Sequence, residues 1–256
     1  MQNITIIKVG GAIVEDNDRL NDLLDRFAGL DGPKVLVHGG GRRATKVASA
    51  LGIETKMVDG RRVTDADMLE VVTMVYGGLV NKNIVARLQA RGVNALGLTG
   101  ADMNVMLSHR RPPRNGVDYG FVGDVDQADG QALASLLERG VIPVMAPLTH
   151  DGKGLLLNTN ADTIAAETAK ALTPFFDVTL VYCFEKAGVL ANPEDDSSVI
   201  PVITKDDFAT LTANGTISGG MKPKIDNALA AVAKGVRRVI ITKAEALGSN
   251  GGTTIE

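Results

Sequence analysis

The stretch Ile4-Thr5-Ile6-Ile7-Lys8-Val9-Gly10-Gly11 is a β-branched run that ends in two glycines. A second stretch, Val35-Leu36-Val37-His38-Gly39-Gly40-Gly41, repeats this pattern within the first 41 residues. Each run predicts a buried strand that turns tightly into a helix. Glycine lets backbone N–H groups approach a ligand closely, and the following helix adds its positive N-terminal end. Since Lys8 stands just ahead of the first glycines, the two turns together predict a cradle for phosphate or carboxylate oxygens.

Strand and helix patterns alternate along the rest of the chain. Strands are expected at 4–9, 34–38, 95–98, 142–145, 178–182 and 238–241. Amphipathic helices are expected at 18–27, 42–51, 65–91 (where Gly77-Gly78 would cause a break), 131–138, 162–172, 205–213 and 224–234. This order predicts an α/β fold with a mainly parallel open sheet and helices on both faces. Short stretches at 105–108, 117–122 and 155–157 are expected to add hairpins, with Asp151-Gly152 as a turn.

The composition excludes several classes of protein. The 256 residues are 45% hydrophobic, and 27 Lys plus Arg stand against 30 Asp plus Glu, a net charge of −3. Because no dense basic run with interleaved aromatic residues occurs, no nucleic-acid partner is expected. No apolar stretch reaches the ~18 residues of a membrane span, and the first residues do not form a signal peptide. With Cys183 as the one cysteine, a cytoplasmic protein is expected.

An arginine pair is the first of three further segments that could contribute to a site. Gly60-Arg61-Arg62-Val63-Thr64 leads into an expected helix. The planar guanidinium donates two parallel hydrogen bonds to a carboxylate, so this segment favours binding of an acid. A pair of solvated surface arginines is the alternative interpretation.

The other two segments lie at the starts of helices. Asn158-Thr159-Asn160-Ala161-Asp162 follows an apolar strand, and ligands bind beyond the carboxyl ends of strands in open α/β sheets. Helix capping is the alternative for these side chains. Ser218-Gly219-Gly220-Met221-Lys222-Pro223-Lys224 places two lysines at a helix N-terminus. A cation there is unfavourable unless an anion compensates it, which indicates a bound phosphate unless the lysines extend into solvent.

Two other site types fit the sequence poorly. The three histidines and single cysteine show no metal-ligand spacing, so no metal site built by the protein is expected. Gly39-Gly40-Gly41-Arg42-Arg43-Ala44 fits the dinucleotide fingerprint, with Asp59 near the acidic position. That interpretation leaves Lys8 and Lys224 without roles, and the turn follows the second strand instead of the first.

Six segments, taken in order, resemble those of the amino-acid kinase superfamily, and within it the N-acetylglutamate kinases. The likeness covers the whole chain, and it is carried by Lys8-Val9-Gly10-Gly11, His38-Gly39-Gly40-Gly41, Gly60-Arg61-Arg62-Val63-Thr64, Asn158-Thr159-Asn160-Ala161-Asp162, Gly220-Met221-Lys222-Pro223-Lys224 and Gly251-Gly252-Thr253-Thr254-Ile255. It implies phosphoryl transfer from ATP to the γ-carboxylate of an N-acylated glutamate, in arginine biosynthesis. It also implies an acylglutamate-binding lobe over 1–174, which holds the dimer interface, and a nucleotide-binding lobe over 175–256, with the boundary near Pro174.

The resemblance assigns roles to single residues. Lys8 and Lys224 would stabilise the transition state, and Asp162 would position them. The other implied contacts are the backbone N–H groups of Gly10, Gly11, Gly40 and Gly41 toward phosphoryl and substrate, the side chains of Arg62, Asn158 and Asn160 toward the acylglutamate, and Tyr182, Gly188, Gly220 and Met221 toward the nucleotide. Mg²⁺ would arrive on the ATP. A γ-carboxylate with a pKa near ~4.3 is already ionised at neutral pH, so no general base is needed, and alignment with charge neutralisation suffices.

The sequence departs from the family at Val181-Tyr182-Cys183-Phe184-Glu185-Lys186-Ala187-Gly188. Many members carry a shorter Ser/Thr-Asp-Val segment here, so the nucleotide contacts are open. The chain also begins at its first strand, without the N-terminal helix of arginine-inhibited hexamers. A homodimer without arginine feedback is therefore expected, with an interface over 69–88 that includes Val71, Val72, Met74, Val75 and Val80; an ordinary buried helix is the alternative.

Three alternative functions stay open. N-succinylglutamate would need a partner for its additional carboxylate, which Arg61 or the Arg110-Arg111 pair could supply. A sister kinase that acts on aspartate, carbamate or a nucleotide fits the segment 158–162 less well. A non-catalytic nucleotide-binding sensor on the same fold is motivated only by the departure near Cys183.

Overall fold

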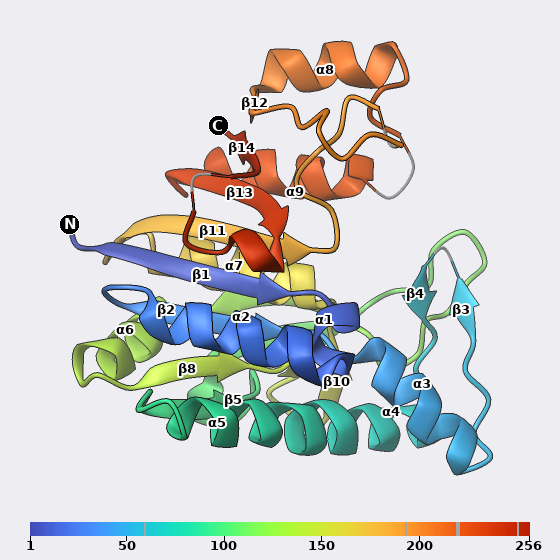
Figure 1. Ribbon diagram of the computed structural model, residues 1–256. Helices are drawn as coiled ribbons and strands as arrows, with labels where there is room; N and C mark the ends of the chain where they lie inside the picture. The colour runs from blue at the N-terminus through green and yellow to red at the C-terminus, as the bar shows by residue number, and fades with distance from the viewer. Residues whose placement is uncertain (59, 193, 219–220, 250) are drawn as a thin grey trace.

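An eight-stranded sheet runs through the middle of the molecule (Figure 1). The computed structural model describes residues 1–58, 60–192, 194–218, 221–249 and 251–256, so Asp59, Gly219 and Gly220 lie outside the described residues. The strand order is β12-β14-β13-β11-β1-β2-β8-β5, and every neighbouring pair is parallel except β13 with β14. The strands are β1 (Asn3–Val9), β2 (Lys34–His38), β5 (Ala95–Leu98), β8 (Ile142–Met145), β11 (Asp177–Phe184), β12 (Val202–Ile203), β13 (Arg238–Lys243) and β14 (Thr253–Ile255).

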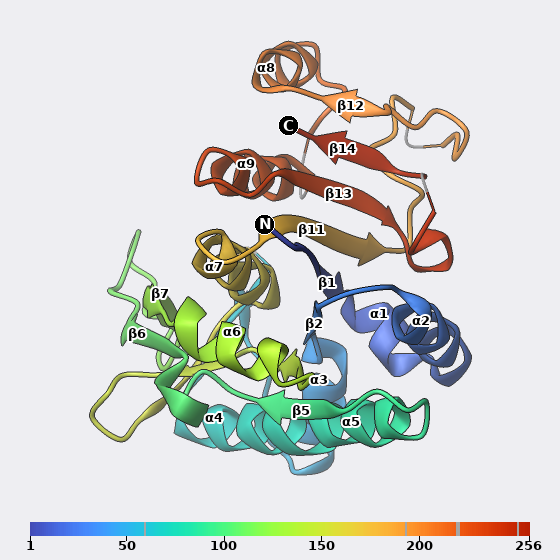
Figure 2. The same cartoon turned by 90° about the vertical axis from the view of Figure 1, so that its left-hand side faces the viewer.

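Helices cover both faces of this sheet, as predicted (Figure 2). Side chains alternate along β1, so that Ile4 and Ile6 enter one core and Ile7 and Val9 enter the other. The Ile4 side is covered by α6 (Gly130–Glu138), α7 (Ala161–Leu172), α8 (Lys205–Ala213) and α9 (Met221–Val232). The Ile7 side is covered by α1 (Gly11–Glu15), α2 (Asn17–Gly29), α3 (Gly41–Ala50), α4 (Ala66–Val72), the π-helical η1 (Thr73–Val80) and α5 (Asn81–Gln89).

The long helix expected over 65–91 continues through Gly77-Gly78 instead of breaking there. The two glycines lie within η1, where the backbone adopts a π-helical turn. Of the apolar residues that were expected at a dimer interface, Val71, Val72, Val75 and Val80 are buried in this chain's own core, whereas Met74 is 52% exposed. Leu79 adds a second large apolar side chain, 40% exposed, to this surface.

A smaller four-stranded sheet follows the order β10-β9-β6-β7. Its strands are β6 (Met106–Arg110), β7 (Gly123–Ala128), β9 (Leu148–His150) and β10 (Leu156–Asn158). The prediction of a strand at 117–122 was wrong. Those residues form a loop with single β-bridges at Val117, Gly120 and Val122. In the bridge at Gly120, the N–H of Thr64 donates to the carbonyl of Tyr119, and the carbonyl of Thr64 accepts from the N–H of Phe121. Gly120 makes the turn with φ +72° and leaves no room for a Cβ against Thr64.

Two short elements extend beyond the main sheet. The hairpin of β3 (Met57–Val58) and β4 (Arg61–Arg62) projects from the body (Figure 1), and 3₁₀ turns occur at η2 (Asp102–Asn104) and η3 (Ala244–Ala246).

The main sheet continues across the expected lobe boundary, since β11 pairs with β1; the division at 174 stays a prediction. Across the described ranges, no helix combines the length and apolarity needed to cross a bilayer.

Candidate active site

Lys8 and Asp162 form an ion pair at the centre of the site. Strand alternation points Lys8 to the same side as Ile6, toward α7. Its Nζ lies 2.6 Å from Oδ1 of Asp162, and Lys8 is only 7% exposed. The cap of α7 is Asn160, whose side-chain oxygen accepts from the backbone N–H of Asp162 at 2.7 Å. Asp162 is therefore not needed as the cap, and its carboxylate pairs with the lysine.

Lys224 reaches the same place from the other end of the chain. It lies in the first turn of α9, and its Nζ is 3.5 Å from the ring centroid of Phe184. The Nζ of Lys8 is 5.1 Å from the same centroid. Burial lowers the pKa of Lys224, and the positive charge of Lys8 lowers it further, while Asp162 opposes the shift. The two ammonium groups thus share one aromatic ring, while the carboxylate of Asp162 pairs with Lys8 alone among the described residues.

The two glycine turns pack directly against each other. The N–H of Gly39 donates to the carbonyl of Val9 at 3.2 Å, and a Cβ on Gly39 would lie 3.4 Å from the nitrogen of Gly11. The N–H of Gly10 donates to the carbonyl of Cys183 at 3.1 Å, which joins the first turn to β11. No side chain caps α1 or α3, so the first-turn N–H groups of these helices remain available to oxygens of a ligand.

One cavity, of about 250 Å³, is lined by residues from the stretch 8–162; we call it the acceptor cavity. Its lining includes Gly41, Arg62, Asn158, Asn160 and Asp162. Arg62 is only 8% exposed. One of its terminal nitrogens donates to the carbonyl of Gly41 at 2.8 Å and to Thr45 at 2.9 Å, and the other donates to Thr55 at 3.3 Å. The Nδ2 of Asn158 donates to the hydroxyl of Thr64 at 2.9 Å.

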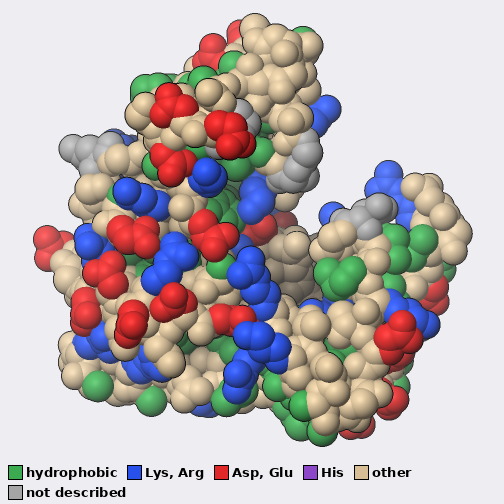
Figure 3. Space-filling model, turned by 45° about the vertical axis from the view of Figure 1, so that its right-hand side comes forward, with side chains coloured by type: hydrophobic (Ala, Val, Ile, Leu, Met, Phe, Trp, Pro, Cys, Tyr) green, Lys and Arg blue, Asp and Glu red, His purple; other side chains and the backbone are tan. Residues whose placement is uncertain are grey.

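A second cavity, of about 490 Å³, is lined by residues from the stretches 8–42 and 184–241; we call it the donor cavity. Its lining includes Gly10, Gly11, Phe184, Gly188, Met221 and Lys224. Lys8 and Gly41 line both cavities, so the lysine stands where the two adjoin. Figure 3 shows a deep hollow between the C-terminal part of the molecule and the side that carries the β3–β4 hairpin, with Lys and Arg side chains near its rim.

Not every predicted side chain lies in these cavities. Tyr182 is 3% exposed and belongs to the core, so the prediction that it contacts a nucleotide does not fit its position. Gly40 is buried behind the turn, against the ring of Tyr76. Gly188 borders the donor cavity but is also a packing glycine, since a Cβ there would lie 2.7 Å from the hydroxyl of Thr253. Gly220 lies outside the described residues.

Two aromatic residues at the site were missed in the sequence. Phe184 presents its ring to both lysines, and Tyr76 supports the second glycine turn, with its hydroxyl 3.9 Å from where a Cβ of Gly41 would be. Phe184 follows Tyr182 by two residues on one strand and therefore shares its face. That spacing indicates the face on which Phe184 lies but not that it reaches the cleft, whereas Tyr76 lies within a long apolar helix and gives no signal.

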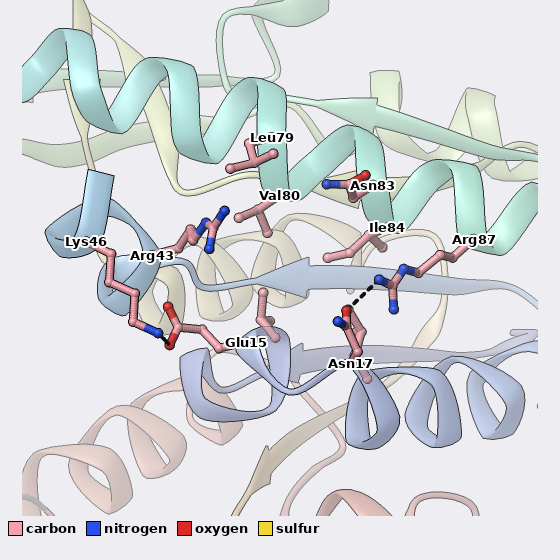
Figure 4. Close-up of a pocket in the computed structure, with 11 residues that line it drawn as sticks. Glu15, Asn17, Arg43, Lys46, Leu79, Val80, Asn83, Ile84 and Arg87 are labelled. Atoms are coloured by element: carbon pink, nitrogen blue, oxygen red, sulfur yellow. Dashed lines mark hydrogen bonds and ion pairs between the residues drawn. The ribbon is translucent and has the colours of Figure 1, made fainter. Parts of the chain in front are cut away.

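A further cavity lies between α1, α3 and the η1–α5 helix (Figure 4). It is lined by none of the predicted site residues. Glu15 pairs with Lys46 at 3.0 Å across it, and Arg87 donates to Asn17 at 2.7 Å. Within the described ranges, no three His, Cys, Asp or Glu side chains gather as a metal site requires. The acceptor and donor cavities, in contrast, are lined by lysines, glycine turns and the buried Arg62.

Comparison with known proteins assigns the chain to a family. The model of the amino acid kinase family matches residues 3–243. The chain belongs to this family. It is 64% identical to an acetylglutamate kinase of Bacteroides thetaiotaomicron over 100% of this chain and 99% of that protein. It is 39% identical to an acetylglutamate kinase of Methanopyrus kandleri over 98% and 99% of the two chains.

Solved structures show the same fold. An N-acetylglutamate synthase from Neisseria gonorrhoeae, complexed with coenzyme A and N-acetyl-glutamate, superposes with a TM-score of 0.83 at 24% identity. The match covers 98% of this chain but only 59% of the synthase chain. A Streptococcus mutans protein matches with a TM-score of 0.77 at 30% identity over 98% of both chains. The expected open αβα architecture is thus shared with these solved structures.

Proposed function

We propose that the chain transfers the γ-phosphoryl group of ATP to the γ-carboxylate of N-acetyl-L-glutamate. The product would be N-acetylglutamyl 5-phosphate, an intermediate of arginine biosynthesis. The observation that carries this proposal is the position of Lys8, which borders both cavities beside Asp162 and Lys224. The high identity to proteins named acetylglutamate kinase supports the choice of acceptor.

The main barrier to this reaction is electrostatic. The attacking carboxylate is already ionised at neutral pH, so it needs no general base, but it must approach a polyanionic donor. Like charges about 4 Å apart repel strongly in a site with little water. Lys8 and Lys224, with the N–H groups of the two glycine turns, would offset that repulsion at the transferring group.

The acceptor cavity would align the acylglutamate. Asp162 holds Lys8 at 2.6 Å, and so fixes the ammonium where the two cavities adjoin. Arg62 retains an Nε–H without a partner among the described residues, and we assign it to the α-carboxylate. Asn158 would contact the N-acyl end, and Asn160, whose oxygen already caps α7, could offer its amide N–H groups. Fixed donors of this kind convert binding energy into alignment of the reacting atoms.

The donor cavity would receive the nucleotide. Its glycine turn, Lys224, Lys186 and Arg42 suit a polyphosphate, and Met221 and Gly188 border the same space. Mg²⁺ in such sites is held by substrate phosphates with one or two carboxylates; Glu185 borders the donor cavity, and Asp162 borders the adjoining acceptor cavity. The ion would neutralise phosphate charge when bound with ATP. This arrangement supports an acylglutamate lobe over 1–174 and a nucleotide lobe over 175–256.

We also propose a homodimer that uses the helical stretch 69–88. Met74 and Leu79 are 52% and 40% exposed on η1, and Leu96 on the neighbouring edge strand β5 is 39% exposed. A second copy of the chain would cover these exposed apolar side chains. A Met74→Glu, Leu79→Glu double variant should run as a monomer in light scattering, and an unchanged mass would contradict this interface.

The test of the main function is formation of an acyl phosphate. Purified chain, MgATP and N-acetyl-L-glutamate should yield a hydroxamate when hydroxylamine is added, with one ADP formed for each hydroxamate. Omission of the acylglutamate serves as the control for simple ATP hydrolysis. ATP binding without hydroxamate, from either acyl substrate, would support the non-catalytic sensor instead.

A second candidate acceptor is N-succinyl-L-glutamate. Arg61 and Arg111 line the acceptor cavity and also a neighbouring cavity of about 540 Å³ that contains Arg114. Arg111 is engaged by the carboxylate of Asp124, whereas Arg61 is exposed and could meet an additional carboxylate. The ratio of kcat/KM for the acetyl and succinyl substrates decides between them, and Arg61→Ala should lower only the succinyl value.

A further inference from the structure

Phe184 contacts three parts of the site at once. It is the last residue of β11, and its ring lies 3.5 Å from Nζ of Lys224 and 5.1 Å from Nζ of Lys8. A Cβ on Gly10 would lie 3.8 Å from its Cδ1, so the ring also borders the first glycine turn. The ring is stacked on the buried Tyr182, with centroids 6.0 Å apart and planes 7° from parallel. The ring of Phe184, stacked on Tyr182, thus lies beneath both ammonium groups.

The two lysines differ in how their charge is matched. Asp162 pairs with Lys8. Among the described residues, the ammonium of Lys224 has no hydrogen bond or ion pair, and its contact is the ring. Burial lowers the pKa of Lys224, and Lys8 acts in the same direction, whereas Asp162 raises it. The other charged groups that border this cavity are Arg42, Glu185 and Lys186, the last of which pairs with Asp196 at 3.0 Å.

A carboxylate and an aromatic ring hold a cation in different ways. A carboxylate would fix Lys224 but would also neutralise it and compete with the phosphoryl oxygens. The face of a ring attracts the ammonium through its quadrupole and adds no net charge. The ring also excludes water from one side, which strengthens the field of the cation at the reacting group.

We propose that Phe184 is a positioning residue, an aromatic platform that holds Lys224 in place while leaving its charge uncompensated for the transferring phosphoryl group. This inference rests on the proposed kinase function. It also gives a role to the segment 181–188, where the chain departs from the Ser/Thr-Asp-Val segment of many family members.

The test varies the ring's quadrupole while nearly preserving its shape. Phenylalanine at position 184 is replaced by 4-fluoro-, 3,4,5-trifluoro- and pentafluorophenylalanine through codon reassignment. A cation–π contact predicts that log kcat falls in step with the loss of negative charge on the ring face, by about 2- to 30-fold in total. In Phe184→Leu, kcat should fall by a similar factor, whereas Phe184→Tyr should keep the parental kcat.

The pH profile gives a second readout that packing alone would not move. The ring favours the charged form of Lys224, so weakening it should lower the pKa of that lysine. The alkaline limb of the kcat profile should then move to lower pH along the fluorine series. Pentafluorophenylalanine at Phe208, a core position, is the matched control and should change neither kcat nor the limb.

The outcomes separate this inference from the proposed function. A flat fluorine series in an active parent would overturn the role of Phe184 and leave the kinase assignment intact. A parent chain that forms no acyl phosphate from either acylglutamate would overturn both. A graded loss of kcat at position 184, absent at position 208, would support the platform.

Discussion

The acceptor cavity and the donor cavity share Lys8 but are held together by different interactions. Around the acceptor cavity, directional hydrogen bonds dominate: Arg62 donates to Gly41 and Thr45, and Asn158 donates to Thr64. Around the donor cavity, Lys224 lies on the ring of Phe184, and a Cβ on Gly11 would meet nothing within 4 Å. The acceptor cavity is therefore lined by groups that hydrogen bonds already fix, whereas the donor cavity keeps open space and a cation that is unpaired among the described residues. This difference suits the small acid and the nucleotide that we propose for them.

The largest expected effect comes from removing either lysine. Lys8→Ala and Lys224→Ala should each lower kcat by about 10²–10³-fold, the range for loss of one preorganised group at a developing charge. The two variants should differ in their free energy of unfolding. Lys8→Ala leaves the partly buried carboxylate of Asp162 without its cation and should cost about 1–3 kcal/mol, whereas Lys224→Ala should cost little. Turnover assays and urea unfolding measure the two quantities.

A double variant tests whether the stability loss comes from the unpaired carboxylate. Adding Asp162→Asn to Lys8→Ala should recover part of the free energy of unfolding without recovering turnover. Equal stability of the two lysine variants would remove the distinction between a carboxylate-held and a ring-held cation. Near-parental turnover in either folded variant would remove that lysine from the catalytic set.

Arg62 tests the acceptor side alone. Arg62→Ala should raise the KM for the acylglutamate by about 10- to 100-fold, since a charge-assisted hydrogen bond contributes about 1.5–3 kcal/mol. The KM for ATP should change much less, because Arg62 does not line the donor cavity. Arg61→Ala, an exposed neighbour, is the control with N-acetylglutamate as substrate. Equal increases in both KM values would mean that Arg62 only supports the fold.

The sequence predicts the bounds of some buried strands, but it does not predict which residue of a strand reaches the cleft. The apolar runs of β2 and β5 predict their observed bounds, because buried parallel strands end abruptly at turn residues. The strand expected to end at Tyr182 runs on to Phe184. Register pairs Val9 with Cys183, so Phe184 is the first residue beyond β1 and reaches the cleft, while Tyr182 stays in the core. Register is a tertiary property that one strand's pattern does not contain.

The roles of neighbouring polar residues were also only partly predictable from the sequence pattern. The segment 158–162 was predicted as a site segment because polar groups follow a strand end, but that pattern alone does not say which residue caps α7; the pairing of Asp162 with a lysine was implied only by the family resemblance. Asn160 caps α7 and Asp162 pairs with Lys8, and either residue type suits either position. The assignment depends on Lys8, which lies more than 150 residues earlier in the chain.

The two glycine turns should tolerate a methyl group differently. A Cβ on Gly40 would lie 2.9 Å from the ring of Tyr76, so Gly40→Ala should force a shift that costs about 1–3 kcal/mol. Gly11→Ala meets open space and should leave the free energy of unfolding nearly unchanged. Urea unfolding of the two variants side by side measures the difference. Equal losses would show that the two turns are equally crowded and would contradict this difference in their packing.

The smallest expected effect concerns the group behind the second glycine turn. His38 is fully buried, and burial lowers its pKa to about 4. Its Nδ1 lies 2.7 Å from the carbonyl of Gly39, which requires a proton on Nδ1. The amide nitrogen of Asn81 lies 3.1 Å from Nε2 and 2.9 Å from the carbonyl of Val144, so Nε2 is the acceptor and the ring is neutral.

This neutral histidine predicts a pH dependence of stability. The unfolded chain binds a proton at His38 near pH ~6.5, but the folded chain does not until the pH approaches 4. The contribution is therefore complete well above pH ~6.5 and is lost as the pH falls toward 4, by about 1 kcal/mol at pH 6. Urea unfolding of the parent and of His38→Gln across this range measures the difference in slope, with His109→Gln, an exposed position, as control. Parallel slopes in the parent and His38→Gln, or an NMR titration of His38 with a midpoint near 6.5, would show that the second turn is not backed by a neutral imidazole.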